Sequence, residues 1–158
     1  MSILSGANLT QTYSATTEGN TPKVGDVFFG PAGKVYKFVQ YNSGAGAVAA
    51  AAGNVCYFYA PSGASAGATT VVTSDLSDSA GVGAGVLQAV IATGEYGWIQ
   101  TKGPATLTTA LTAGADGNAL TAVGATDGTL DVSALVTDAI VAYAIDASAK
   151  IVMCDFPW

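Results

Sequence analysis

The sequence predicts an all-β fold, a small β-sandwich or barrel domain with an extended N-terminal arm, and three observations support this. Short runs of β-branched and aromatic residues, such as Lys34–Tyr41 and Val55–Tyr59, recur along most of the chain. Turn-forming residues separate these runs, and the 158 residues include 20 glycines. The segment richest in helix formers, Ala45–Ala52, is short and flanked by glycine, so we expect one helical turn there at most.

The predicted arm comprises residues 1–22. Its residues are mostly small and polar, with few apolar anchors, so this segment has little to pack around on its own. It also lacks the positively charged start and long apolar stretch of a secretory signal, and we expect none. Residues 23–158 form the predicted β domain, which is large enough to bury a core without metal or disulfide support.

The β domain begins with the predicted strands Asp26–Phe29 and Lys34–Tyr41, joined by a Gly-Pro-Ala-Gly turn. Further strands are predicted at Val55–Tyr59, Thr69–Thr73, Val86–Ala92, Tyr96–Thr101, Thr106–Leu111, Ala119–Val123, Thr129–Val132, Ala139–Ile145 and Ile151–Asp155. The dipeptides Asp116-Gly117 and Asp127-Gly128 are typical of turns. The glycine run Gly81–Gly85 lacks the Gly-Lys-Ser/Thr ending of a phosphate-binding loop, so we expect a structural loop.

Composition excludes several classes of function. The chain contains no histidine and no arginine, and its formal net charge is −6. An acidic chain is repelled by nucleic acid and by anionic membrane surfaces, so we expect neither as a partner. No apolar stretch approaches the roughly 18 residues of a membrane-spanning helix.

The sequence predicts no enzyme, no catalytic residues, no metal site and no cofactor. A serine or threonine nucleophile needs a base, histidine is absent, and no Ser-x-x-Lys spacing occurs. The aspartates do not match the alternating pattern of a calcium loop. Cys56 and Cys154 lie far apart in apolar settings, which leaves two alternatives: buried thiols or a disulfide.

The candidate residues for packing or for an interface are Tyr96, Trp98, Gln100 and Trp158. In a strand, the first three project to one face, and the neighbouring Gly97 lets a backbone segment or an aromatic ring lie close. We therefore expect Trp98 to be buried against the core or a subunit neighbour. The high apolar content and the many tyrosines predict self-association, most simply as a homotrimer.

The segment from Thr93 to Pro104 reads Thr-Gly-Glu-Tyr-Gly-Trp-Ile-Gln-Thr-Lys-Gly-Pro. It is similar to a stretch of the head decoration (cement) proteins and other small virion proteins of tailed bacteriophages. In that family a Tyr-Gly-Trp-[Ile/Val]-Gln strand precedes a glycine, an alanine-rich segment, a Gly-x-x-Leu turn and two valine-rich strands. The corresponding parts of this chain are Gly103-Pro104, Thr109–Ala115, Gly117–Leu120, Ile140–Ile145 and Ile151–Met153, with Lys37–Val39 upstream.

The resemblance implies a β-sandwich or tulip-like fold, assembled as a trimer on the outside of a capsid. It implies a structural virion protein, made in the host cytoplasm, that stabilises the shell by bridging subunits of the major capsid protein. The arm would order on docking and extend across a neighbour. The alternative is a phage tail or fibre component that binds a host surface glycan, which requires an exposed aromatic platform.

Overall fold

The computed structural model describes residues 3–4, 6–14, 22–61 and 70–157, and these residues form an all-β fold, as predicted. The strands are β1 (Ile3–Leu4), β2 (Val27–Phe29), β3 (Val35–Tyr41), β4 (Val55–Tyr59), β5 (Val71–Thr73), β6 (Ser79–Leu87), β7 (Tyr96–Thr106), β8 (Ala119–Thr121), β9 (Asp131–Val132), β10 (Ile140–Asp146) and β11 (Ile151–Asp155). Two short 3₁₀ turns, η1 (Pro31–Gly33) and η2 (Leu76–Asp78), are the only helical segments among the described residues.

Strand pairing closes a ring in the order β3, β5, β4, β6, β7 and back to β3. Within the ring, β3 and β5 run parallel and the other neighbours run antiparallel. The inside of the ring is filled by apolar side chains, including Val39, Val72, Leu87 and Ile99. Closure leaves these strands without free edges between them, which removes sites for unwanted strand pairing.

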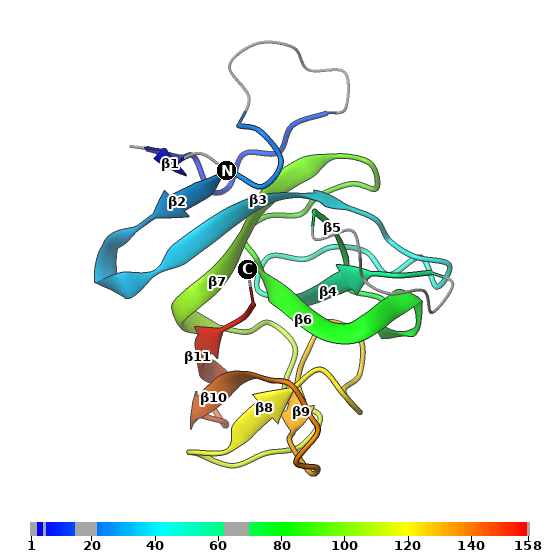
Figure 1. The fold of residues 1–158 in the computed structure, drawn as a ribbon, viewed down its shortest axis with the longest axis vertical. Coiled ribbons are helices and arrows are strands. Elements are labelled where there is room, and N and C mark those ends of the chain that lie inside the picture. The colour runs from blue at the N-terminus through cyan, green and yellow to red at the C-terminus, as the bar shows by residue number, and fades with distance from the viewer. Residues whose placement is uncertain (1–2, 5, 15–21, 62–69, 158) are drawn as a thin grey trace.

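A second set of strands extends the sheet from the far half of β7, in the order β11, β10, β8, β9 (Figure 1). In Figure 1 these strands form the lower end of the molecule. Their inner faces pack on the outside of β4 and β6, and the core between them contains Val86, Leu120, Val152 and Phe156. The fold therefore combines a closed ring with a sandwich-like second layer.

Strand β4 lies between the two cores, which explains its nearly continuous apolar sequence. Val55 and Tyr57 face the core shared with β10 and β11, whereas Cys56 and Phe58 face the inside of the ring. A strand buried on both faces requires apolar residues at successive positions, because neighbouring side chains point to opposite sides.

Strand β7 can serve both layers because it bends at Gly103. This residue has a φ of 89°, which favours glycine, and a Cβ atom there would lie 3.1 Å from the carbonyl oxygen of Gly33. Before the bend β7 pairs with β3 and β6, and after it β7 pairs with β11. The bend thus turns one strand from the ring into the extension.

Part of the predicted arm lies against the ring. Tyr13 forms two backbone hydrogen bonds with Tyr96, at 2.9 and 2.8 Å, and β1 pairs in parallel with β2. Side chains of residues 6–14 contact the outer face of β3 and β7. The remainder of the arm prediction, residues 1–2, 5 and 15–21, lies outside the described residues.

Three predicted elements were wrong in part. Gly81–Gly85 is not a loop but belongs to strand β6, where glycine allows close contacts: a Cβ atom at Gly85 would lie 2.8 Å from the carbonyl oxygen of Gln100. Of the predicted strand Val86–Ala92, only Val86 and Leu87 lie in a strand, and they are the last two residues of β6. The predicted strand Thr106–Leu111 is irregular after Thr106, where β7 ends.

Candidate interaction surface

Trp98 lies at the centre of an aromatic cluster on the outer face of β3 and β7. Its side chain is completely buried, and its ring makes an edge contact with Phe38 at 5.2 Å between centroids. Phe28 is a further ring neighbour at 6.4 Å. Ala7, Leu9 and Tyr13 of the N-terminal segment cover the cluster. The burial expected for Trp98 is confirmed, and the covering group is the chain's own N-terminal segment.

A group does lie close beside Gly97, but it is the aliphatic side chain of Ile91 and not the backbone or ring that was expected. A Cβ atom at Gly97 would lie 2.5 Å from the Cδ1 atom of Ile91, so any larger residue would require this side chain to shift. Trp98 carries one unusual feature. Its indole Nε1–H is buried and has no hydrogen-bond partner among the described residues. Such orphan donors are rare in buried positions.

Gln100 has a positioning role inside the protein. It is 2% exposed, and its side-chain Nε2 donates to the carbonyl oxygens of Lys102, Gly103 and Pro104 at 2.9–3.1 Å. These carbonyls belong to the bend of β7, where its pairing passes from β3 to β11. The side chain therefore holds the bend. Trp158, the remaining predicted residue, lies outside the described residues. An interface role for these four residues stays a prediction.

Several large apolar side chains of the extension are exposed on the outer face of β10 and β11, apart from the still more exposed Leu135 and Val136 in the loop before β10. Tyr143 pairs directly with Met153, and Met153 pairs with Pro104 of β7, so the three lie in one row across the sheet. Tyr143 is 48% exposed and Met153 is 42% exposed. Ile145, on the same strand as Tyr143, is 45% exposed. We call Pro104, Tyr143, Ile145 and Met153 the outer apolar face.

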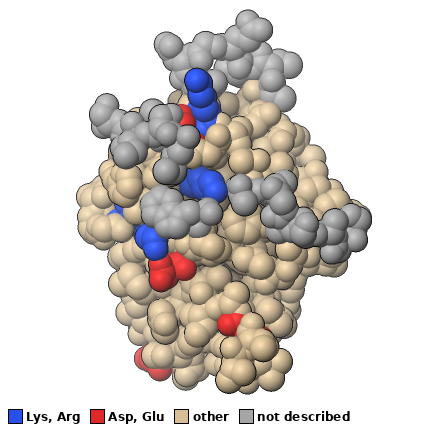
Figure 2. Space-filling view, viewed as in Figure 1, with Lys and Arg blue, Asp and Glu red and all other residues tan. Residues whose placement is uncertain are grey.

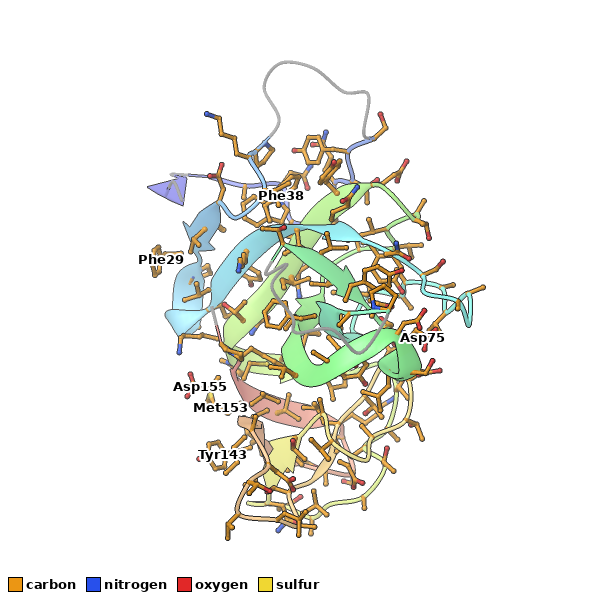
Figure 3. All side chains as sticks on the ribbon, turned by 45° about the vertical axis from the view of Figure 1, so that its right-hand side comes forward. Phe29, Phe38, Asp75, Tyr143, Met153 and Asp155 are labelled. Carbon is orange, nitrogen blue, oxygen red and sulfur yellow. The ribbon has the colours of Figure 1, made fainter. Side chains whose placement is uncertain are left out.

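Figure 3 shows that Tyr143 and Met153 project outward from one side of the molecule, with Phe29 of β2 farther up the same side. Phe29 is 52% exposed. Asp155, also on this side, forms an ion pair with Lys102 next to the outer apolar face. Both partners are partly exposed, so this pair contributes little stability and mainly keeps the two charges neutralised. Charged side chains are sparse over the surface viewed in Figure 2.

The sequence contained a signal for this face that strand prediction alone did not use. From Ala142 on, strand β10 carries apolar residues at positions that point to both sides of the sheet, Ala142 and Ala144 inward and Tyr143 and Ile145 outward. A strand with one solvent-exposed face normally alternates apolar and polar residues. Apolar residues on both sides indicate that the outer side has a partner.

Apart from Asp155, the aspartates of the described chain accept hydrogen bonds from backbone N–H groups. The carboxyl of Asp75, 2% exposed, accepts from the Ser77 hydroxyl at 2.6 Å and from the backbone N–H groups of Gly46 at 2.8 Å and Ser77 at 3.0 Å, and these hydrogen bonds, the hydroxyl's first, lower its pKa. Asp116 and Asp127 do precede glycines of positive φ, as expected for turns, but their carboxylates bond distant segments, at Ala147 and Leu76. No group of histidine, cysteine, aspartate or glutamate suited to a metal ion occurs in the described part of the chain.

The two cysteines are free thiols that lie in different cores. Cys56 faces the inside of the ring, and Cys154 faces the core between the layers. Burial raises the pKa of Cys154 to about 12 and raises that of Cys56 further. Because the thiolate is the reactive form, neither sulfur has nucleophilic character near neutral pH. Of the two alternatives for these residues, the structure has the buried thiols.

Comparison of the chain with protein-family models, with curated proteins and with solved structures found no match. Within the described ranges, no helix has the length and apolar character needed to cross a membrane.

Proposed function

We propose that this chain is a structural virion protein that binds the outside of a phage capsid and stabilises the shell by bridging major capsid subunits. The observation that carries the proposal is the outer apolar face, in which Tyr143, Ile145 and Met153 stand exposed on a well-paired sheet. Exposed apolar patches of this kind mark sites of protein association. The family resemblance of Thr93–Pro104 supports a capsid as the partner.

The mechanism is mechanical. A DNA-filled shell pushes its subunits apart, and a protein that contacts two neighbours adds interface that must be broken before they separate. Each contact can be weak, because many copies act together around the shell. A rigid contact surface favours this role, and the outer apolar face sits on regular strands, whose ordering is already complete before binding.

We also propose that the protein acts as a homotrimer and without enzymatic activity. A trimer would present three copies of the outer apolar face to neighbouring subunits, which strengthens binding through avidity. The aspartates are engaged with backbone N–H groups and the thiols are buried, which leaves these groups unsuited to catalysis. Light scattering of the purified protein tests the trimer, and a monomer at micromolar concentration contradicts it.

The alternative function, binding of a host glycan by a tail or fibre component, needs an exposed aromatic ring framed by polar groups. Trp98 is buried under the N-terminal segment, and the exposed ring of Tyr143 has Met153 as its direct cross-strand neighbour. This arrangement favours a protein partner over a sugar.

The decisive experiment is a count of copies in purified virions by quantitative mass spectrometry. Hundreds of copies per particle support head decoration, whereas a handful indicates the tail and contradicts the proposal. In a second measurement, purified protein is added to filled shells that lack it. Saturable binding and a higher temperature of DNA release are expected. Shells that neither bind the protein nor gain stability contradict the role.

A further inference from the structure

A second candidate site lies at one end of the ring, away from the outer apolar face. It is a depression of about 350 Å³ between the loop that follows β3 and the loop that leads into β7. Its lining includes Tyr41, Ala50, Val90, Ile91, Thr93 and Glu95. Tyr41, Ala50 and Ile91 are buried members of the ring core, so the depression opens above apolar side chains.

The wall formed by the loop after β3 is held in place by two carboxylates. Asp75 accepts a hydrogen bond from the backbone N–H of Gly46, and Asp78 accepts one from that of Ala45. Within this wall, the hydroxyl of Tyr41 donates to the carbonyl oxygen of Val48 at 2.7 Å. Close contact requires the glycine, because a Cβ atom at Gly46 would lie 2.7 Å from Oδ2 of Asp75.

The opposite wall is equally well fixed. The backbone N–H of Tyr41 donates to the carbonyl oxygen of Glu95, and that of Gly94 donates to the carbonyl oxygen of Tyr41, both at 2.9 Å. Thr93 links the two walls, since its hydroxyl accepts from the N–H of Ser43 at 3.1 Å. The depression therefore has a defined shape before anything binds, which lowers the entropic cost of binding.

Glu95 differs from the other carboxylates of the described chain. Every described aspartate accepts a hydrogen bond or forms an ion pair through its side chain: Asp26, Asp75, Asp78, Asp116, Asp127, Asp131, Asp138, Asp146 and Asp155. The side chain of Glu95 has no such partner within the described residues, although it is only partly exposed and lines the depression. A carboxylate without a partner beside apolar walls suits a cation that carries an aliphatic stem.

We propose that this depression binds a lysine side chain of a partner polypeptide. The methylene stem packs against Val90, Ile91 and Ala50, and the ammonium group pairs with the carboxylate of Glu95. Charge complementarity supports a basic partner, because this chain carries a formal net charge of −6. The inference does not depend on a capsid role, since any partner with an exposed lysine satisfies it.

The test is an NMR titration of the full-length ¹⁵N-labelled protein with N-acetyl-lysine methylamide. The norleucine analogue, which has a similar stem and no charge, serves as the matched probe. We expect saturable shifts of the amides in residues 43–50 and 90–95, with a dissociation constant in the millimolar range, as for other very small ligands. Binding of the lysine probe should weaken with added salt, whereas binding of the norleucine probe should not.

Glu95→Gln should weaken the lysine probe about three- to tenfold and leave the norleucine probe unchanged. The matched control is Glu18→Gln, which removes the same charge at the chain's other glutamate. Equal affinity for both probes, equal effects of both substitutions, or no shifts in the two loops would each overturn the proposal. None of these results bears on copy number in virions, so this inference and the capsid role can fail separately.

Discussion

The two halves of strand β7 present apolar side chains on their outer faces, yet only one half is covered. Around Trp98, residues 6–14 lie over the aromatic cluster, and the Trp98 side chain is completely buried. Beyond the bend at Gly103, Pro104 joins Met153 and Tyr143 in a row that stays exposed. The difference shows that apolar strand residues mark a covered face in one place and an open one in another. The face that the chain's own N-terminal segment covers contributes to folding, whereas the face that the chain leaves exposed is open to another protein.

The comparison predicts opposite results for alanine substitutions on the two faces. Trp98→Ala should lower the free energy of unfolding by about 3–5 kcal/mol, because it empties a fully buried site. In a domain of this size the melting temperature should fall on the order of 10 °C. The matched substitution Tyr143→Ala should cost about 0.5 kcal/mol or less, as for most surface changes. Thermal melts of both variants decide this, and equal shifts would break the comparison.

Lowering the pH tests whether the loop after β3 depends on the buried carboxylate of Asp75. This prediction concerns neither of the two outer faces of β7. Hydrogen bonds from Ser77 and Gly46 lower the pKa of Asp75 below its ordinary value of 3.8. The stabilisation by Asp75 is therefore complete above pH 3.8 and is lost as the pH falls through the lowered pKa of the folded state. Asp75→Asn should cost about 1–2 kcal/mol at neutral pH and reduce the loss of stability in acid.

Chemical denaturation from pH 7 down to pH 2.5 measures this effect. The control is Asp146→Asn, at the last residue of β10, where hydrogen bonds from Ala149 and Ser148 also lower the pKa of the carboxyl. A curve for Asp75→Asn that follows the wild type at every pH would show that the carboxylate does not hold the loop.

Removal of a side chain that covers the aromatic cluster should make the outer face of β7 around Trp98 more accessible to solvent. Tyr13→Ala deletes the ring that contacts Phe38 at 5.5 Å between centroids, while the backbone bonds to Tyr96 can remain. We expect a loss of about 1–2 kcal/mol, from the apolar area and the aromatic contact. Emission from Trp98, recorded in a Trp158→Phe background, should become more accessible to acrylamide. Unchanged quenching would mean that residues 6–14 do not protect the cluster.

The fold was largely predictable because its strands carry local signals. The predicted strands at Lys34–Tyr41, Val55–Tyr59 and Ile151–Asp155 agree with β3, β4 and β11 within one residue. The glycines of β6 misled the prediction, because glycine normally interrupts a strand. Here Gly83 admits the ring of Phe156, whose Cε1 atom would lie 2.8 Å from an added Cβ. That requirement comes from a residue more than 70 positions away and leaves no local trace.

The candidate surface was harder to predict than the fold, for the same reason. The strand pattern identified Trp98 as a packing position, but the cover comes from Leu9 and Tyr13, in a segment predicted not to fold on its own. Tyr143 and Met153 lie in predicted strands, yet their exposure depends on the order of strands in the sheet. Glu95 stands out only once the partners of the other carboxylates are known. Local sequence determines strands, whereas tertiary pairing determines which surfaces remain open.

The smallest effect on stability should accompany the largest effect on association. Tyr143→Asp and Met153→Asp place a charge on the outer apolar face, where both side chains are about half exposed, so the free energy of unfolding should change by about 1 kcal/mol or less. Binding to filled shells should fall at least tenfold, because a charge in the centre of an apolar contact must be desolvated without a partner. Val136→Asp adds the same charge at a fully exposed loop position and should leave both stability and binding unchanged. Melting curves and co-sedimentation with shells measure the two effects on the same samples. If all three variants bind like the wild type, the outer apolar face is not the contact surface, and the bare half of β7 has no partner on the shell.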